Sequence, residues 1–307
     1  MRRRLAAGPR FGVIPAALLG AALLTSAAAA QDDTAIVRGE YVFRAAGCES
    51  CHTDREGGGA WLSGGRVLET PVGRFISPNL TPDSETGIGG WSEGDLARAL
   101  RHGIAPDGSN YYPAFPYPAY SGMTDADIGD LKAFLDSVPP VHNPTDRHEL
   151  AWPYSWRILL GLWKLIGFSP GPFERDPARS EAWNRGAYLV TVLGHCGECH
   201  TPRGGFGLTD EDSALAGTAK GPDGKRVPNI TPDPETGIGG WSARDIVRLL
   251  RRGFDPEGDD VQGAMAEVVE HGTRHLHADD LEAIAVYLLE LAPIRHATSP
   301  PSPTLSP

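Results

Sequence analysis

The cysteines of this chain lie in two copies of one pentapeptide. The first copy reads Cys48-Glu49-Ser50-Cys51-His52, and the second reads Cys196-Gly197-Glu198-Cys199-His200. Two cysteines three residues apart, followed directly by a histidine, are typical of covalent c-type haem attachment. On one helical turn both thiols can reach the vinyl groups of a single porphyrin, and the next imidazole can bind its iron. The pattern predicts two haems, with His52 and His200 as iron ligands.

Other uses of paired cysteines fit this sequence less well. A thioredoxin-like disulfide needs a βαβ context, which the sequence lacks. One shared zinc ion would require both pairs to converge across a long stretch of chain. Structural disulfides are common in exported proteins, but they would leave both histidines unexplained. The residues therefore favour haem attachment.

Each iron also needs a sixth ligand or an open coordination site. Besides the initiator, the chain has two methionines, Met123 and Met265, and Met/His ligation suits electron transfer. We interpret each as the axial ligand of one haem. The two are not equivalent in sequence, because Phe115 lies near the place that corresponds to Met265. If Met123 did not bind, the first iron would be five-coordinate or use His102, which aligns with Arg252 on a helix and is expected at the surface.

An internal repeat surrounds the two pentapeptides. Residues 79–92 and 229–242 are identical at 12 of 14 positions. Residues 38–54 align with 185–202, with one extra residue before the second cysteine pair. This repeat predicts a duplicated domain.

Each copy predicts a helix that runs into the cysteine pair, a Gly-rich loop, and two further helices. Ser92 and Ser242 are expected to cap the helix after the loop, and the last helix should begin near Thr124 or His277. Gly39 and Gly186 should let the first helix cross closely beneath the last one. No stretch alternates at period two for long enough to require a strand. The predicted fold is all-α, with two tandem domains of short helices around one haem each.

Two repeated side chains of the loop are further candidates for haem contacts. Trp91 and Trp241 each carry an indole N–H, which can only donate and therefore suits a propionate; core packing is the alternative. Asn79 and Asn229 could contact a propionate or hold the loop. Both asparagines also fit the pattern of glycosylation acceptors.

The predicted layout begins with a cleaved secretory signal peptide at 1–30, which has a basic start, an apolar middle and small residues at its end; a retained membrane anchor is the alternative. The domains follow at 31–142 and 182–296, a linker occupies 143–181, and 297–307 is a disordered tail. Export would place the protein in the periplasm.

The charge of the chain excludes one class of partner. Its 307 residues contain 28 Lys and Arg against 39 Asp and Glu, a net charge of −11. This acidic balance is unlike that of a nucleic-acid-binding protein.

The sequence predicts a short amphipathic helix in the linker. The pattern places Arg157 and Lys164 opposite an apolar face. We expect this helix to pack across the domain junction or to dock on a membrane or partner subunit, with residues 152–173 as the membrane-associating segment. The apolar face comprises Trp156, Leu159, Leu160, Trp163 and Ile166.

Taken together, these motifs resemble those of class I di-haem cytochromes c, especially the cytochrome subunits of periplasmic alcohol, aldehyde and gluconate dehydrogenases. The resemblance rests on GHCGECHTPR (194–203), the two TPDxETGIGGW loops, and YPAFPYPAYSGMTDAD (112–127). Many relatives have an axial methionine where this chain has Phe115, and in members similar to this one Met123 replaces it. Such subunits commonly carry three haems, whereas this chain has attachment sites for two.

The resemblance implies an electron-transfer protein without catalysis of its own. It would accept single electrons from a periplasmic dehydrogenase and pass them to a cytochrome or terminal oxidase. The rival interpretation is a di-haem peroxidase or a sulfur-compound oxidoreductase, in which the first haem would have an open site.

Overall fold

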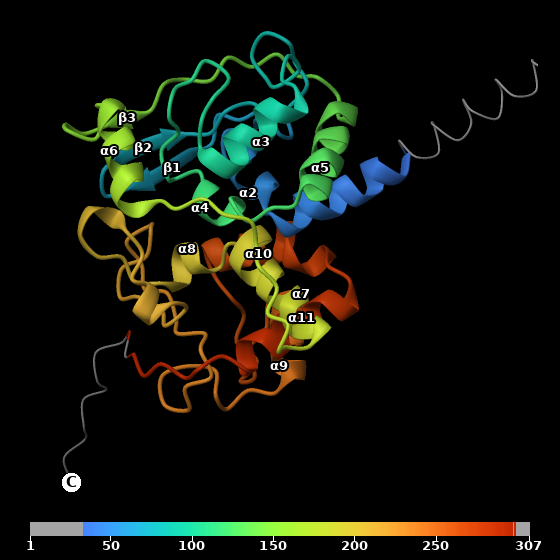
Figure 1. The fold of residues 1–307 in the computed structure, drawn as a ribbon, viewed down its shortest axis with the longest axis vertical. Coiled ribbons are helices and arrows are strands. Elements are labelled where there is room, and N and C mark those ends of the chain that lie inside the picture. Colours follow the sequence, from blue (N-terminus) through green and yellow to red (C-terminus); the bar gives the residue numbers. More distant parts are fainter. Residues whose placement is uncertain (1–32, 297, 299–307) are drawn as a thin grey trace, which may run out of the picture.

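The computed structural model describes residues 33–296 and 298. Figure 1 shows two halves, one above the other, built from the earlier and the later parts of the chain. The expected signal peptide, 1–30, lies outside the described residues, as does nearly all of the expected tail, 297–307. The division into two domains at the expected boundaries stays a prediction.

The first half begins with a helix over residues 33–45. Its other elements are α2 (Cys48–His52), β1 (Val67–Thr70), β2 (Gly73–Ile76), α3 (Glu93–His102), α4 (Tyr117–Tyr120), α5 (Asp125–Ser137), β3 (Glu149–Leu150) and the connecting helix α6 (Ile158–Gly167).

The second half contains α7 (Glu181–Tyr188), a π-helical turn (Leu189–Leu193), α8 (Gly197–His200), short 3-10 turns (Gly205–Gly207 and Glu211–Ser213), α9 (Ala243–Arg252), α10 (Ala264–His271), a further 3-10 turn (Thr273–His275) and α11 (Ala278–Leu289).

The helix boundaries follow the predicted caps. Ser92 caps α3 in a reciprocal arrangement with Asp95, and Ser242 does the same for α9 with Asp245. Thr124 caps α5 through the N–H of Asp127. These bonds satisfy backbone donors that would otherwise lack partners at the first turn. Local sequence therefore determines where the helices begin.

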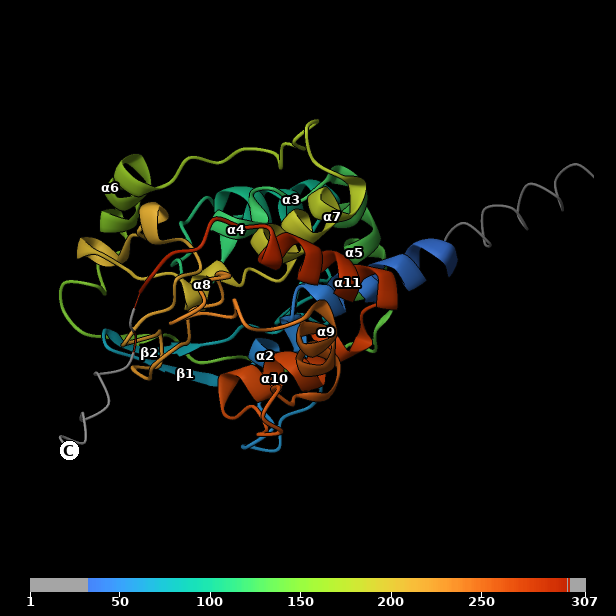
Figure 2. The same cartoon turned by 90° about the horizontal axis from the view of Figure 1, so that it is seen from below.

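The predicted close crossing of the first and last helices is confirmed in both halves. A Cβ at Gly39 would lie 1.9 Å from the carbonyl oxygen of Asp130, and one at Gly186 would lie 2.0 Å from that of Ala283. Only glycine allows the two backbones to approach so closely. Figure 2 shows the second-half pair, α7 beside α11.

The prediction of a purely α-helical fold is wrong because the first half contains a small antiparallel sheet. The central strand, β2, pairs with β1 and, on its other side, with β3. The buried ring of Phe75 in β2 packs on Tyr112, with ring centroids 5.4 Å apart. Strands of four, four and two residues are too short for an alternating pattern to reveal them, and β3 joins from a distant part of the chain.

The connecting helix α6 is oriented differently from the prediction. Lys164 does not point away from the protein: its ammonium donates to the carbonyls of His102 and Gly103, at 2.6 and 2.8 Å. These carbonyls end α3 and need donors from elsewhere. Leu160 is buried, whereas Ile166, expected on the same face, is 67% exposed. Among the described residues, no helix is both long and apolar enough to cross a bilayer.

The two halves meet through reciprocal contacts of equivalent residues. The Tyr41 hydroxyl donates to Asp280 and accepts the N–H of His277 at 3.2 Å. In the other direction, the Tyr188 hydroxyl donates to Asp127 and accepts the N–H of Thr124, also at 3.2 Å. Each half thus caps the last helix of the other.

This exchange is the pattern of an isologous interface, in which a pair of surfaces is used twice. It relates the halves by an approximate two-fold axis. In both views α2 of the first half lies against α10 of the second (Figures 1 and 2).

The carboxylate of Asp280 should make stability depend on pH. Burial alone would raise the pKa of Asp280, but hydrogen bonds from Arg185 and Tyr41 hold it below its usual value. A lowered carboxyl pKa stabilises the fold above the unfolded-state pKa of about 4, and this stabilisation is lost as pH falls. We expect Asp280→Asn to lower the free energy of unfolding by about 2 kcal/mol at pH 7, and by less at pH 3.

Urea denaturation across this pH range measures the effect. Asp279→Asn, at an exposed neighbouring position that makes neither bond, is the control. Parallel pH profiles of Asp280→Asn and the wild type would contradict the assignment.

Candidate functional site

Each predicted iron-binding histidine is held by one hydrogen bond from its ring. The Nδ1 atom of His52 lies 2.8 Å from the carbonyl oxygen of Pro78, and that of His200 lies 2.8 Å from the oxygen of Pro228. A carbonyl can only accept, so Nδ1 carries the proton and Nε2 keeps its lone pair. Burial lowers the pKa of both imidazoles, which favours the neutral form that binds metals.

A tight backbone contact positions the two proline carbonyls. A Cβ at Gly64 would lie 2.5 Å from the carbonyl carbon of Pro78, and one at Gly217 would lie 2.5 Å from that of Pro228. Both glycines have a positive φ, +74° and +76°, and their N–H groups donate to the carbonyls of His52 and His200. In each repeat, one glycine therefore contacts both the histidine and the proline that are joined by the hydrogen bond.

A strained leucine supports the same loop in both repeats. Leu62 and Leu215 have φ values of +59° and +62°, a conformation that costs non-glycine residues energy. Each N–H donates at 3.1 Å to a threonine hydroxyl, that of Thr53 or Thr201, in the residue after the histidine. Both strained leucines lie beside a predicted iron-binding histidine, and the bond to the threonine hydroxyl helps to hold each of them in this conformation.

The four thiols are free and next to these histidines. Burial raises the pKa of Cys48 and of Cys196 to about 12. A protonated thiol is a poor nucleophile, so neither pair has the activated thiolate of a disulfide oxidoreductase. Among the described residues, no three His, Cys, Asp or Glu side chains are arranged to hold a metal ion, so the pairs do not converge on one zinc site.

The two methionines occupy non-equivalent positions. The carbonyl of Met123 accepts two hydrogen bonds from Arg101, at 3.0 and 2.6 Å. The equivalent arginine, Arg251, instead bonds the carbonyl of Leu276 at 3.3 Å. Leu276 thus takes the place of Met123 in the second half, and Met265 lies on α10. Met123 is 1% exposed and belongs to the hydrophobic core cluster, whereas Met265, like Cys48 and Cys196, is partly buried and packs against that cluster.

The asparagines of the repeated loops bind protein groups. The amide nitrogen of Asn79 donates to the Thr86 hydroxyl at 3.1 Å and to the Val141 carbonyl at 2.7 Å. Asn229 makes the equivalent bonds to Thr236 and Ile294, at 3.0 and 2.8 Å. Since both amide hydrogens have protein acceptors, these side chains join the loop to the segment after the last helix.

The indole groups of the repeated loops differ from these asparagines in their hydrogen bonding. Trp91 and Trp241 are partly buried against the core. Within residues 33–296, no protein acceptor is found for either indole N–H, so both donors can serve a bound group. His102 is exposed, as expected.

The donor set of each half fits one covalently held haem. It offers two free thiols on one turn, a neutral imidazole with a free Nε2, and a thioether in the same apolar cluster. The cysteine–histidine spacing and the methionines were predicted from sequence. The supporting residues (Leu62, Gly64, Pro78 and their counterparts Leu215, Gly217, Pro228) were missed, although the repeat alignment could have indicated them.

Comparisons with known proteins find relatives described as cytochromes c. A family model described as cytochrome c matches residues 36–139. The chain is 48% identical over 256 residues to a protein of Cereibacter sphaeroides described as "Diheme cytochrome c-type", covering 82% of this chain and 84% of that protein.

Two further relatives are described as dehydrogenase subunits. The fructose dehydrogenase cytochrome subunit of Gluconobacter japonicus is 41% identical, over 82% of this chain and 52% of that protein. The gluconate 2-dehydrogenase cytochrome c subunit of Pantoea cypripedii is 40% identical, over 87% and 63%. The chain thus spans only part of the length of these two subunits.

The contact between Gly217 and Pro228 predicts a costly substitution. Gly217→Ala would place a Cβ 2.5 Å from Pro228, and overpacking of this kind costs about 1–3 kcal/mol. The control is Gly224→Ala, because Gly224 has a similar φ of +78° and open space at its Cβ. We expect Gly217→Ala to lower the free energy of unfolding by at least ~1 kcal/mol more than the control. Equal losses in denaturant titrations would contradict the contact.

Proposed function

The chain belongs to the di-haem cytochrome c family, and on that premise we propose that it is an exported electron carrier with two covalently bound haems. It would consist of two tandem class I cytochrome c domains, at 31–142 and 182–296. In this proposal it receives single electrons from a periplasmic dehydrogenase and passes them to another cytochrome or a terminal oxidase. The observation that carries the proposal is the repeated histidine–carbonyl bond beside two free thiols.

The residues have distinct roles in this proposal. Cys48 and Cys51 attach the first haem, and Cys196 and Cys199 attach the second. His52 with Met123, and His200 with Met265, are the axial ligands. The haem iron supplies a reversible one-electron couple, whose potential a thioether ligand raises.

The repeated loops support the bound groups. We assign propionate contacts to Trp91 and Trp241, because their indole N–H groups have no protein acceptor in the described part of the chain. Asn79 and Asn229 we assign to holding the loop, since their amide hydrogens are already bonded.

The relatives support a dehydrogenase as the electron donor. Those that match along most of this chain include cytochrome subunits of fructose, gluconate and alcohol dehydrogenases. With two thioether ligands, neither iron has an open position for substrate, so we propose no catalysis by the chain itself. A peroxidase or sulfur-compound oxidoreductase would require an open first haem.

We also propose that the chain associates with a membrane surface through residues 152–173. Ile158 and Leu165 are 82% and 86% exposed, although apolar side chains of this size favour burial. Exposed Trp152 and Trp156 precede them in the chain, and residues 151–173 include no Asp or Glu. A short helix with tryptophans and no acidic residue suits the interface of an anionic bilayer.

Substitution of Met123 tests the axial ligand. We expect Met123→Leu to keep two haems per chain while one becomes high-spin and its midpoint potential falls, because the thioether is lost. Met265→Leu should do the same to the other haem. EPR and redox titration of the ferric and half-reduced protein measure both effects. A high-spin haem already present in the wild type, unchanged in Met123→Leu, would favour the open-site alternative.

Vesicle flotation tests the membrane proposal. Burying a leucine contributes about 1.5–3 kcal/mol, so the double variant Leu162→Ser, Leu165→Ser should bind phosphatidylglycerol-containing vesicles more than tenfold more weakly. Phe254→Ser, which alters an exposed apolar residue in the second half, is the control. If wild type and double variant float equally, or neither floats, the proposal is wrong.

A further inference from the structure

The helix α10 carries Met265, the proposed ligand of the second iron, in its first turn. Within its own half this helix buries Val269. Its side chains Glu267 and His271 contact the first half instead. These two residues are four positions apart and therefore lie on the same face of the helix. The helix that presents the second ligand is thus in contact with both halves.

Arg66 of the first half makes one of these contacts. Its guanidinium donates to both carboxylate oxygens of Glu267, at 2.5 and 2.9 Å. This paired geometry makes an arginine–carboxylate contact strong and directional, and the two side chains are only 29% and 37% exposed. The same guanidinium also donates to the carbonyl of Ser50, which lies between the two cysteines of the first pentapeptide. One arginine therefore joins the first attachment turn to the helix of the second ligand.

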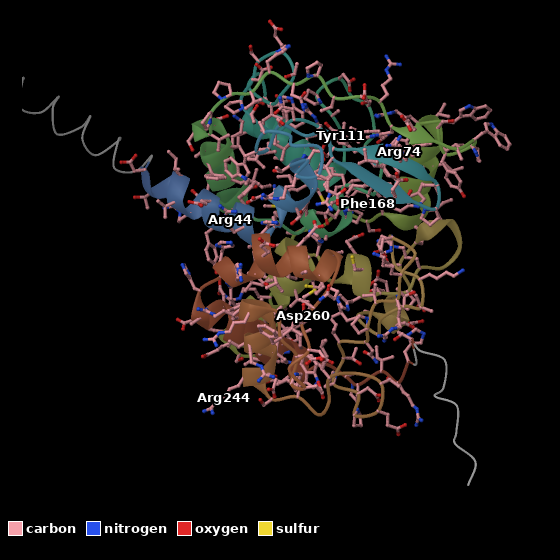
Figure 3. All side chains as sticks on the ribbon, turned by 180° about the vertical axis from the view of Figure 1, so that it is seen from behind. Arg44, Arg74, Tyr111, Phe168, Arg244 and Asp260 are labelled. Carbon is pink, nitrogen blue, oxygen red and sulfur yellow. The ribbon has the colours of Figure 1, made fainter. Side chains whose placement is uncertain are left out.

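The other end of α10 also lies against the first half. The Nδ1 atom of His271 is 3.8 Å from a carboxylate oxygen of Glu49, whose side chain is 7% exposed and pairs with Arg44 and Arg55. Directly after the helix, a Cβ at Gly272 would lie 3.2 Å from the carbonyl oxygen of Arg44. Figure 3 shows Arg44 at the border of the halves. The first half thus contacts α10 along its length.

The sequence does not repeat these contacts in the opposite direction. The tyrosine caps of the interface are reciprocal, but the repeat alignment places Ala219 opposite Arg66 and Gly197 opposite Glu49. Neither alanine nor glycine has a side chain that can form an ion pair. The polar contacts of α10 are therefore an addition to the symmetric interface, made at the second ligand and not at the first.

We propose that Arg66 is a positioning residue for the second haem: through Glu267 it holds α10 in the place from which Met265 reaches the iron. Two residues correspond to about 200° of rotation around a helix, so Met265 faces away from Glu267. The helix is held on one side and presents its ligand on the other. The first half thereby completes the second site. This inference rests on the proposed function, because it requires Met265 to be the axial ligand.

Competition with imidazole tests this role in the haem-loaded protein. Added imidazole binds ferric iron only when the thioether has dissociated, so its apparent affinity rises with the population of the open state. We expect Arg66→Gln and Glu267→Gln, which remove the same pair from either side, to strengthen imidazole binding at one haem about tenfold. Arg66→Lys keeps the charge without the paired geometry and should have a smaller effect. Optical titration of the ferric protein measures the affinities.

The matched control is Arg74→Gln. Arg74 also pairs with two carboxylates, those of Glu69 at 3.0 Å and Glu149 at 2.6 Å, but all three residues belong to the sheet of the first half, where Figure 3 shows Arg74. We expect this control to keep the imidazole affinities of the wild type at both haems.

A double variant shows whether Arg66 acts through the methionine. Met265→Leu removes the thioether and opens the same iron, so adding Arg66→Gln to it should not strengthen imidazole binding further. A further increase in the double variant would mean that Arg66 acts by another route, and the proposal would be overturned.

Unchanged imidazole binding in Arg66→Gln, together with stronger binding in Met265→Leu, would overturn the role of Arg66 and leave the proposed function intact. If Arg66→Gln does not mature, Glu267→Gln decides in its place: stronger binding supports the proposal and unchanged binding overturns it. Failure of the proposed function would be seen separately, as a wild-type protein that carries fewer than two haems, or as unchanged imidazole binding in Met265→Leu, which would remove the ligand assignment and this inference with it.

Discussion

The hydrogen bond between a histidine ring and a proline carbonyl is the constraint on which the rest of the site depends. It gives His52 and His200 a defined tautomer, in which Nδ1 donates and Nε2 is free to bind metal. Keeping the carbonyl in place requires a glycine with positive φ and a strained leucine before it. The chain builds this arrangement twice, and nearly identical distances result.

The second organising feature is the way in which the two halves face each other. A tyrosine beside each attachment segment caps the last helix of the opposite half. Because the same contact is made in both directions, a single pair of complementary surfaces stabilises the interface twice. The interface also brings the attachment segments together, which a chain of two independent domains would not do.

The two repeats differ by one inserted residue and in the positions of their methionines. One added residue, His195, places an imidazole across the interface and is accommodated by a π-helical turn. Arg101 bonds the Met123 carbonyl in the first half, whereas its counterpart Arg251 bonds the Leu276 carbonyl in the second, so the two methionines lie at non-equivalent positions. The two sites therefore have different surroundings.

The sequence alone was sufficient for the features that depend on neighbouring residues. The attachment pentapeptides, the helix caps at Ser92 and Ser242, and the close crossings at Gly39 and Gly186 follow from local spacing and from the repeat. Tertiary structure decided the others. The strand at Glu149 pairs with residues far away in the chain, Lys164 turns inward to the carbonyls at the end of α3, and Asn79 bonds a segment 62 residues later. Such contacts depend on partners that sequence spacing does not bring together, so only the folded chain reveals them.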